Sequence, residues 1–248
     1  MPEISIITAL YNCVGLTRQY VESLEKTLTN IDWELILIDD ASSDETPAFL
    51  EELKKNPRVQ CLRNETNIGY SASNNRGAIQ ANSDKLAFLN NDLVLSEGWL
   101  EQMLSVLEEA ENAGVVGNIQ FNPNTGLIDH AGVFFGLDGM PRQARKNRAR
   151  VPTVPYSEWN AVTAACMIIP KPLFEECGGF DEDYRNGFED IDLCAKVRQK
   201  GFRIYVANRS KIDHLVSVSP GRHKHNDRNS KLFQERWTHI TSEWGAKE

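Results

Sequence analysis

The chain has 248 residues, with 27 Lys and Arg against 35 Asp and Glu, which gives a formal net charge of −8. Hydrophobic residues make up 41% and charged residues 25%, a composition typical of folded globular proteins rather than disordered or fibrous ones. Phosphate binding along a nucleic acid needs a basic surface, so an acidic chain of this kind is expected to have no nucleic-acid partner.

The sequence also lacks the marks of a membrane or secreted protein. No stretch approaches the roughly 18 apolar residues of a membrane span, and the first residues lack the basic then apolar order of a signal peptide. The 5 cysteines are odd in number, irregularly spaced and without a CxxC pair, which argues against a disulfide framework. We therefore expect a soluble, reduced protein of the cytoplasm.

Apolar runs alternate with helical stretches through residues 1–120. Strands are expected at 4–8, 34–38, 59–62, 86–89 and 115–117, and helices at about 16–28, from 43 onward, at 71–81 and at 98–111. The apolar runs are continuous, which is typical of a parallel sheet with helices on both faces. In such sheets the ligand site lies beyond the C-terminal ends of the strands.

Polar residues stand at three of these strand ends. They are Tyr11 with Asn12, Asp39 with Asp40, and the segment 90–92. Asn and Asp are common in turns, so each group alone could be plain turn chemistry. Three groups at neighbouring strand ends favour a binding site.

The second half changes character. Strands are expected at 133–135, 162–170, 203–207 and 212–214, turns at 122–126 and 178–181, and a helix from 188 to about 200 with Gly201 as its C-cap. The polar tail 217–230 is expected to form a mobile loop before a short terminal helix. Without repeats or a low-complexity linker, we expect a single domain, residues 1–248, with a nucleotide-binding half (1–120), an acceptor-binding and catalytic half (121–220) and a tail (221–248).

Several common catalytic motifs are absent from the sequence. It contains no GxGxxG after the first strand, no GxxxxGK[ST] and no GxSxG. A dinucleotide oxidoreductase, a P-loop NTPase and the common hydrolases are therefore disfavoured. A nucleotidyltransferase is also disfavoured, because no glycine-rich basic loop follows the first strand.

Acidic residues and one histidine near the C-terminus remain as candidates for ligand binding, metal binding or catalysis. Asp40 could accept a hydrogen bond from the imide of uracil or thymine, and Asp92 could ligate Mg²⁺ or Mn²⁺. His214 could add a nitrogen ligand, although a single histidine is more often structural. Glu189 and Asp190 could cap a helix N-terminus, or one of them could act as a general base.

These residues resemble the motifs of family 2 glycosyltransferases. The matching segments, in order, are 5–12, 38–44, 67–69, 88–92 with Trp99 and Leu100, 178–182, and 189–193. The resemblance spans residues 4 to about 219 and has the character of bacterial rhamnosyltransferases and related enzymes. Asn90 replaces the first Asp of the family's DxD motif, whereas Asp92 retains the last.

The resemblance implies a GT-A (Rossmann-like) α/β fold. In this fold a mostly parallel central sheet carries helices on both faces, beside a small mixed sheet on the acceptor side. It also implies an inverting enzyme of polysaccharide biosynthesis in the bacterial cell envelope. The donor would be a UDP- or dTDP-linked sugar, and the acceptor a hydroxyl of a glycan or lipid-linked saccharide. A lipid-linked acceptor would bring the protein to the inner face of the membrane.

The resemblance also assigns roles to individual residues. Nucleotide and donor contacts are assigned to Thr8, Leu10, Tyr11, Asp40, Asn67, Gly69, Asn90 and Asn91. Asp92 and His214 would hold a divalent cation, Mn²⁺ or Mg²⁺. Asp190 would be the general base, and Glu189 would orient Asp190 or an acceptor hydroxyl. Trp159, Asp181 and Arg145 are candidate acceptor residues.

Three alternatives stay open at this point. The chain could be a non-catalytic module that binds nucleotide sugars or glycans within a larger assembly. The basic segment 142–150 is either a solvated loop or a surface that attracts a phosphate-bearing acceptor. The tail could close over a bound diphosphate, and its residues 223–225 could form a metal site. The oligomeric state is not indicated.

Overall fold

The computed structural model describes residues 1–215 and 225–245 of the chain. Its strands are β1 (Ile4–Leu10), β2 (Trp33–Asp39), β3 (Val59–Arg63), β4 (Lys85–Leu89), β5 (Leu93–Val94), β6 (Ala113–Asn122), β7 (Leu127–His130), β8 (Val133–Phe135), β9 (Pro141–Gln143), β10 (Tyr156–Trp159), β11 (Cys166–Pro170) and β12 (Arg203–His214). Its helices are α1 (Val14–Thr27), α2 (Thr46–Leu53), α3 (Tyr70–Gln80), α4 (Trp99–Glu109), α5 (Lys171–Glu176), α6 (Glu189–Gln199) and α7 (Asn226–Thr241).

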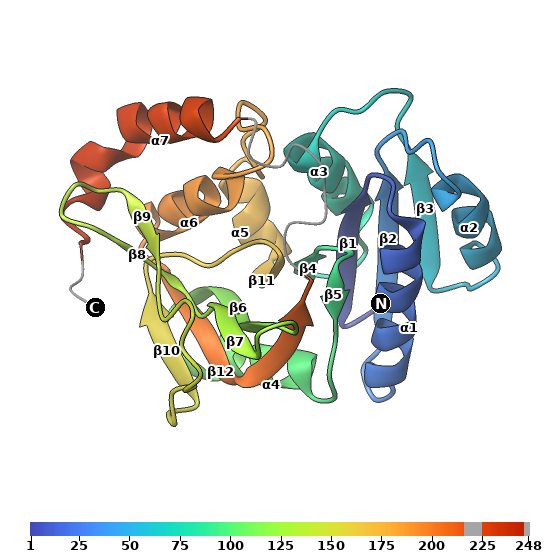
Figure 1. The fold of residues 1–248 in the computed structure, drawn as a ribbon, viewed down its shortest axis with the longest axis horizontal. Coiled ribbons are helices and arrows are strands. Elements are labelled where there is room, and N and C mark those ends of the chain that lie inside the picture. The colour runs from blue at the N-terminus through green and yellow to red at the C-terminus, as the bar shows by residue number, and fades with distance from the viewer. Residues whose placement is uncertain (216–224, 246–248) are drawn as a thin grey trace.

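One large sheet runs through the molecule in the order β10-β12-β6-β11-β4-β1-β2-β3 (Figure 1). β4, β1, β2 and β3 are mutually parallel, and β12 is parallel to β6. β11 lies between β4 and β6 and is antiparallel to both. β5 and β7 pair with β12 and β6 at the margin of the sheet, and a small second sheet consists of the antiparallel pair β8 and β9. The expected α/β architecture with a central, mostly parallel sheet is confirmed.

Both faces of the sheet are covered by helices. On β2, Leu35 and Leu37 pack into a core formed with α1, α2 and α4, while Ile36 and Ile38 enter a second core formed with α3, α5, α6 and α7. Successive side chains of a strand point to opposite faces, so burial on both faces requires apolar residues at every position. This explains why the first strands read as continuous apolar runs.

The second half differs from expectation in several elements. β12 is one continuous strand where two short ones were expected, and β5, β7, β9, β10 and α5 were not anticipated. α7 already begins at Asn226 and has 16 residues, so the expected loop is wrong for residues 226–230. The helix persists because Phe233 and Trp237, one turn apart, pack into the core. Residues 216–224 of the expected loop lie outside the described part of the chain.

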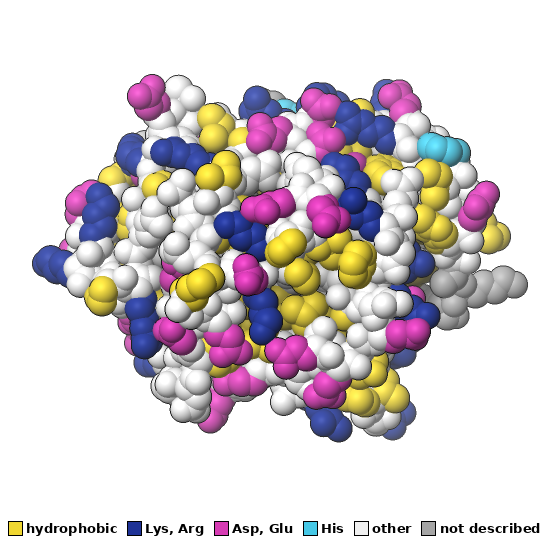
Figure 2. All heavy atoms as spheres, turned by 180° about the vertical axis from the view of Figure 1, so that it is seen from behind, with side chains coloured by type: hydrophobic (Ala, Val, Ile, Leu, Met, Phe, Trp, Pro, Cys, Tyr) yellow, Lys and Arg dark blue, Asp and Glu magenta, His cyan; other side chains and the backbone are white. Residues whose placement is uncertain are grey.

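The surface of the described residues carries both signs of charge. In Figure 2, which shows the molecule from behind, acidic and basic side chains are interspersed, with apolar side chains between them. Within residues 1–215 and 225–245, no helix has the length and apolar character needed to cross a membrane.

Glycine is required where α3 packs against the central strands. A Cβ atom at Gly77 would lie 2.6 Å from the Cδ1 atom of Ile38 and 2.6 Å from the Cγ2 atom of Ile7. Gly77→Ala is therefore expected to lower the free energy of unfolding by about 1–3 kcal/mol, because overpacking outweighs the better helix propensity of alanine. The measurement is urea denaturation.

Gly15→Ala in α1 is the matched control, because no heavy atom lies within 4 Å of its added Cβ. It should leave the free energy of unfolding unchanged or raise it by up to about 1 kcal/mol. Equal effects of the two substitutions would contradict close packing at Gly77.

Candidate active site

A cavity of about 440 Å³ lies at the C-terminal ends of β1, β2 and β4. This is the edge at which a doubly wound sheet binds its ligands. The cavity is also bounded by the segment that leads into β11 and by the start of α6. Its lining residues are Ala9, Leu10, Tyr11, Cys13, Leu16, Asp40, Asn67, Gly69, Tyr70, Asn90, Asn91, Asp92, Thr163, Ala164, Ala165, Asn186, Gly187, Glu189, Asp190 and His225.

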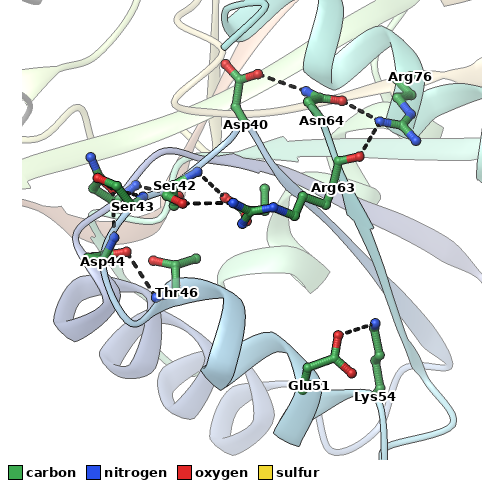
Figure 3. Close-up of polar contacts among 12 residues, drawn as sticks. Asp40, Ser42, Ser43, Asp44, Thr46, Glu51, Lys54, Arg63, Asn64 and Arg76 are labelled. Carbon is green, nitrogen blue, oxygen red and sulfur yellow. Dashed lines mark hydrogen bonds and ion pairs between the residues drawn. The ribbon is translucent and has the colours of Figure 1, made fainter. Parts of the chain in front are cut away.

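Asp40, directly after β2, is buried and held by three hydrogen bonds. Its Oδ1 atom accepts from the side-chain amide of Asn64 and the backbone N–H of Ile68, both at 2.8 Å, and its Oδ2 atom accepts from the N–H of Gly69 at 2.9 Å. Figure 3 shows Asn64 between Asp40 and Arg76, to which Asn64 is also bonded. A carboxylate has about four lone-pair sites, so these bonds fix its orientation and leave one acceptor direction for a ligand.

The two neighbouring carboxylates of this motif have other partners. Asp39 accepts from the N–H of Ser42 at 2.9 Å and forms an ion pair with Arg63. Asp44 accepts from the N–H of Val14 at 3.0 Å and from the N–H of Thr46 at 3.0 Å, so it caps the starts of both α1 and α2. These two residues hold the strand-end loops together, and only Asp40 of the three lines the cavity.

Asp190 lies in the first turn of α6 and lines the same cavity as the strand ends. Its Oδ2 atom accepts from the backbone N–H of Ala164 at 3.1 Å, and its Oδ1 atom accepts from the N–H of Ile191 at 2.9 Å. Burial raises the pKa of Asp190 above its ordinary value, and these hydrogen bonds only partly oppose the rise. A raised pKa makes a carboxylate a better proton acceptor, as a general base requires.

The other acidic residues of α6 have different partners. Glu189 also lines the cavity, and its Oε2 atom accepts from the N–H of Gly187 at 2.6 Å. Asp192 accepts from the indole N–H of Trp237 at 2.7 Å and pairs with Lys196 at 2.7 Å. Asp192 therefore joins α7 to α6, away from the cavity.

Asp92 and His214 meet where β5 pairs with the end of β12. The His214 Nε2 atom lies 3.3 Å from Oδ1 of Asp92, and its Nδ1 atom lies 3.5 Å from Oδ2 of Asp129. Burial lowers the pKa of His214, but the two carboxylates outweigh burial and raise the pKa overall. Asp129, in β7, is paired with Lys146 at 3.2 Å. Although burial acts to raise it, the pKa of Asp129 is held to about 2 by His214 and Lys146.

His130, the last residue of β7, is buried next to this group. Its Nε2 atom accepts from the backbone N–H groups of Gly132 and Thr163, both at 3.3 Å. The Nδ1 atom therefore carries the proton and donates it to Oε1 of Gln143 at 2.8 Å. Burial lowers the pKa of His130 to about 4, so the ring is neutral at pH 7.

Sequence reasoning missed both Asp129 and His130. They stand in a strand of four residues, which carries no periodic signal of its own. β7 is defined by its pairing with β6, a long-range contact that places Asp129 at His214 and His130 at Thr163. The only local hint is the polar pair followed by the small residues Ala131 and Gly132.

The expected donor-binding residues converge with one exception. Leu10, Tyr11, Asp40, Asn67, Gly69, Asn90 and Asn91 all line the cavity. Thr8 is fully buried one pleat earlier, and its hydroxyl is 2.9 Å from the hydroxyl of Tyr20, so its side chain does not line the cavity. His225, immediately before α7, lines the cavity, whereas residues 223 and 224 of the suggested metal site lie outside the described residues.

The expected acceptor residues separate into two places. Trp159 and Arg145 line a second cavity together with two further arginines. Asp181 lies in neither cavity; its carboxylate pairs with Arg236 of α7 at 2.8 Å and approaches Lys196 of α6 at 3.8 Å. Asp181 therefore links the two helices, and its expected role in acceptor binding stays a prediction.

The sequence matches the family model described as Glycosyl transferase family 2 over residues 5–178. The chain belongs to this family. It is 32% identical over 230 residues to the O-antigen biosynthesis protein RfbC of Myxococcus xanthus, covering 88% of this chain and 18% of that protein. It is 29% identical over 216 residues to the putative glycosyltransferase EpsE of Bacillus subtilis, covering 82% and 69% respectively. The chain thus spans less than a fifth of the length of RfbC.

Solved structures show the same fold. A structure of GalNAc-T7 with UDP, GalNAc and Mn²⁺ aligns with a TM-score of 0.72 at 18% identity, covering 94% of this chain and 48% of that one. The mannosyltransferase PcManGT of Pyrobaculum calidifontis, in complex with GDP-Man and Mn²⁺, aligns with a TM-score of 0.69 at 16% identity over 99% of this chain and 65% of that one. The expected GT-A fold is confirmed.

The buried, neutral His130 predicts a pH dependence of stability. Its pKa is about 4 in the folded protein and about 6.5 in the unfolded chain, so only the unfolded state gains a proton between these values. Relative to His130→Gln, the wild-type protein should therefore lose about 3 kcal/mol of its free energy of unfolding between pH 7 and pH 4.

The measurement is urea denaturation of both proteins across this pH range. The exposed His239 provides a control, because His239→Gln removes an imidazole that is not buried. A difference between wild type and His130→Gln that stays constant from pH 7 to pH 4 would refute a buried neutral imidazole.

Proposed function

We propose that this protein transfers a sugar, with inversion of the anomeric carbon, from a UDP- or dTDP-linked donor to a hydroxyl of a glycan or lipid-linked saccharide. The observation that carries the proposal is the placement of Asp40, Asp92 and Asp190 on the wall of one cavity, with the pKa of Asp190 raised. These three carboxylates suit three tasks: binding a base, holding a cation and accepting a proton.

The nucleoside would bind at the ends of β1 and β2. Tyr11 lines the cavity with about half of its surface exposed, which offers an aromatic face to a pyrimidine ring. The remaining acceptor direction of Asp40 suits the imide N–H of uracil or thymine, which a cytosine ring does not have. Asn67, Gly69, Asn90 and Asn91 also line the cavity, where they would contact the ribose and the diphosphate.

Asp92 and His214 would hold a divalent cation, Mn²⁺ or Mg²⁺. Ligands at adjacent positions of an octahedral cation lie about 3 Å apart, which agrees with the 3.3 Å between Nε2 of His214 and Oδ1 of Asp92. Few protein ligands are needed, because substrate phosphates commonly complete the shell of such cations. A bound cation would offset the negative charge that develops on the leaving diphosphate. The nitrogen ligand favours Mn²⁺.

Asp129 would orient the cation-binding histidine. Metal-binding histidines commonly donate their second ring N–H to a carboxylate, which fixes the tautomer and the ring plane. Asp129 faces Nδ1 of His214 in this way, while Lys146 holds Asp129 from the other side.

Asp190 would act as the general base. A neutral hydroxyl is a poor nucleophile, so Asp190 accepts its proton while the oxygen attacks the anomeric carbon opposite the leaving diphosphate. The hydrogen bond from the N–H of Ala164 holds Oδ2 in place during this step. One displacement of this kind inverts the anomeric configuration, and Glu189 lies beside it to orient the acceptor hydroxyl.

The similarity to RfbC supports a role in assembling a surface polysaccharide. Nucleotide-linked donors are made in the cytoplasm, so we place the reaction there, at the inner membrane face if the acceptor is lipid-linked. A non-catalytic binding module is the alternative. Binding of UDP with Mn²⁺ by the wild-type protein, with neither transfer nor donor hydrolysis for any nucleotide sugar, would favour that alternative.

Asp190→Asn keeps the size of the side chain but removes the proton acceptor. It is expected to lower kcat for transfer by at least about 10²-fold while donor KM stays near the wild-type value. Steady-state kinetics with a donor found by nucleotide-sugar screening provides the measurement. Asp192→Asn, on the same helix, should instead lower stability and leave the turnover of folded enzyme unchanged, because Asp192 contacts Trp237 and Lys196. Wild-type turnover in Asp190→Asn would sink the assignment of the base.

Substitutions at the cation site should weaken metal-dependent nucleotide binding. Asp92→Ala and His214→Ala are expected to abolish the enhancement of UDP affinity by Mn²⁺, and Asp129→Ala to weaken Mn²⁺ affinity by about 10–100-fold. Isothermal titration calorimetry with UDP and Mn²⁺ measures both effects. Asp138→Ala is the control, because Asp138 pairs with Arg142 on the surface. Unchanged Mn²⁺ affinity in Asp129→Ala would exclude an orienting role for Asp129.

A further inference from the structure

A second cavity, of about 470 Å³, is lined by Arg145, Arg148, Arg150 and Trp159. None of these residues lines the cavity assigned to the donor. Three guanidinium groups around one hollow stand out in a chain whose net charge is −8. The donor reaction described above gives this cavity no task.

The ion pairs of segment 142–150 are made by residues outside the second cavity, which leaves positive charge on residues that line it. Arg142 pairs with Asp138 at 2.9 Å and Lys146 pairs with Asp129 at 3.2 Å, and neither residue lines the cavity. Arg148 and Arg150 do line it, and neither forms an ion pair with a carboxylate of residues 1–215 or 225–245. The cations that line the cavity therefore suit an anionic ligand.

The backbone of the segment is anchored to β7. The N–H of Ile128 donates to the carbonyl of Arg148 at 2.9 Å, and the N–H of Asn147 donates to the carbonyl of Ile128 at 2.8 Å. The N–H of Arg148 also donates to the carbonyl of Arg145 at 3.1 Å, which closes a turn. The arginines thus project from an ordered loop, which lowers the entropic cost of binding a ligand between them.

Trp159 forms the aromatic part of the cavity. A Cβ atom at Gly132 would lie 2.4 Å from its ring, and Gly132 has a φ of +110°, so only glycine allows this contact. The carbonyl of Trp159 also accepts from Arg198 of α6 at 3.4 Å. The ring is therefore fixed, with its remaining surface available to a ligand.

The second cavity lies close to the proposed reaction centre. Trp159 lines one cavity and Thr163 lines the other, and four residues of extended chain span at most about 14 Å. The link is direct, because Nε2 of His130 accepts from both Gly132, under the Trp159 ring, and Thr163. A ligand in the second cavity could therefore belong to the same molecule that reacts at Asp190.

We propose that this cavity binds a phosphate or diphosphate ester carried by the acceptor, close to the hydroxyl that receives the sugar. The inference rests on the proposed transferase function. Arginine suits this ligand because its planar fork donates two parallel hydrogen bonds to phosphate oxygens. Both a lipid diphosphate at the end of a saccharide and a phosphodiester within a polymer carry the required group.

The test compares a synthetic disaccharide bearing an alkyl diphosphate with the same disaccharide lacking phosphate. Calorimetry without added metal should show that wild type binds the first at least about tenfold more tightly. Arg148→Gln/Arg150→Gln should lose this preference while keeping UDP affinity and donor hydrolysis. Arg142→Gln/Lys231→Gln, which removes the same charge from residues outside the cavity, should keep the preference.

Equal affinity of wild type for the two disaccharides, or an unchanged preference in Arg148→Gln/Arg150→Gln, would overturn the proposal. A third probe, a disaccharide with an internal phosphodiester, distinguishes the sources: tighter binding of the diphosphate supports a lipid-linked acceptor, and tighter binding of the diester supports a phosphate-containing polymer. Absence of both sugar transfer and donor hydrolysis in wild type would count against the transferase function alone, since the phosphate preference is measured by binding.

Discussion

The backbone of residues 163–165 is the constraint on which the rest of the site depends. This short segment leads into β11, the antiparallel strand between the two parallel parts of the sheet. The Thr163 N–H donates to His130, the Ala164 N–H donates to Asp190, and the Ala165 carbonyl accepts from Asn90. The Ala164 carbonyl also accepts from the hydroxyl of Tyr70, at the start of α3. This single short segment, which turns just before β11 begins at Cys166, therefore sets the distance between the strand-end loops and the proposed base. Small side chains at 164 and 165 leave the space in front of it open as cavity.

The carboxylates in and around the site form two groups, one that joins structural elements and one that faces the cavity. Asp39, Asp44 and Asp192 accept hydrogen bonds or ion pairs that join one element to the next, so their negative charge is compensated within the protein. Asp40 and Asp190 are also bonded to backbone N–H groups, yet both retain an edge on the cavity. An acidic protein that binds an anionic donor must supply positive charge locally. A divalent cation at Asp92 and His214 would do so for the donor, and the arginine-lined cavity would do so for the acceptor.

The sequence predicted the structure best where the local pattern of apolar and polar residues follows directly from the position of a strand in the sheet. The continuous apolar runs predicted the parallel strands, because burial on both faces demands them, and the polar residues at the strand ends predicted the part of the cavity wall that β1, β2 and β4 supply. It failed where an element is defined only by distant pairing. β5 and β7 have two and four residues, so neither can be recognised without the strand that it pairs with. Asp129 and His130 were missed for this reason. Thr8 shows a different limit: it lies two residues before Leu10 on the same face of β1, and this difference in depth along the strand buries it against Tyr20 instead of at the cavity.

β7 connects the two cavities through its last two residues. Asp129 lies between His214 and Lys146, and His130 lies between Thr163 and Gln143. Lys146 and Gln143 belong to the stretch that carries the three cavity arginines, so the loop that lines the second cavity also holds the supports of the cation site and of the 163–165 segment. Positions in a packed network of this kind are coupled, because a shift of one member displaces the hydrogen-bond partners of the next. An acceptor phosphate held by Arg148 and Arg150 would thus bind to the same loop that positions Asp129 and His130. Acceptor binding would therefore be coupled to the geometry of the metal ligand His214 and of the base Asp190.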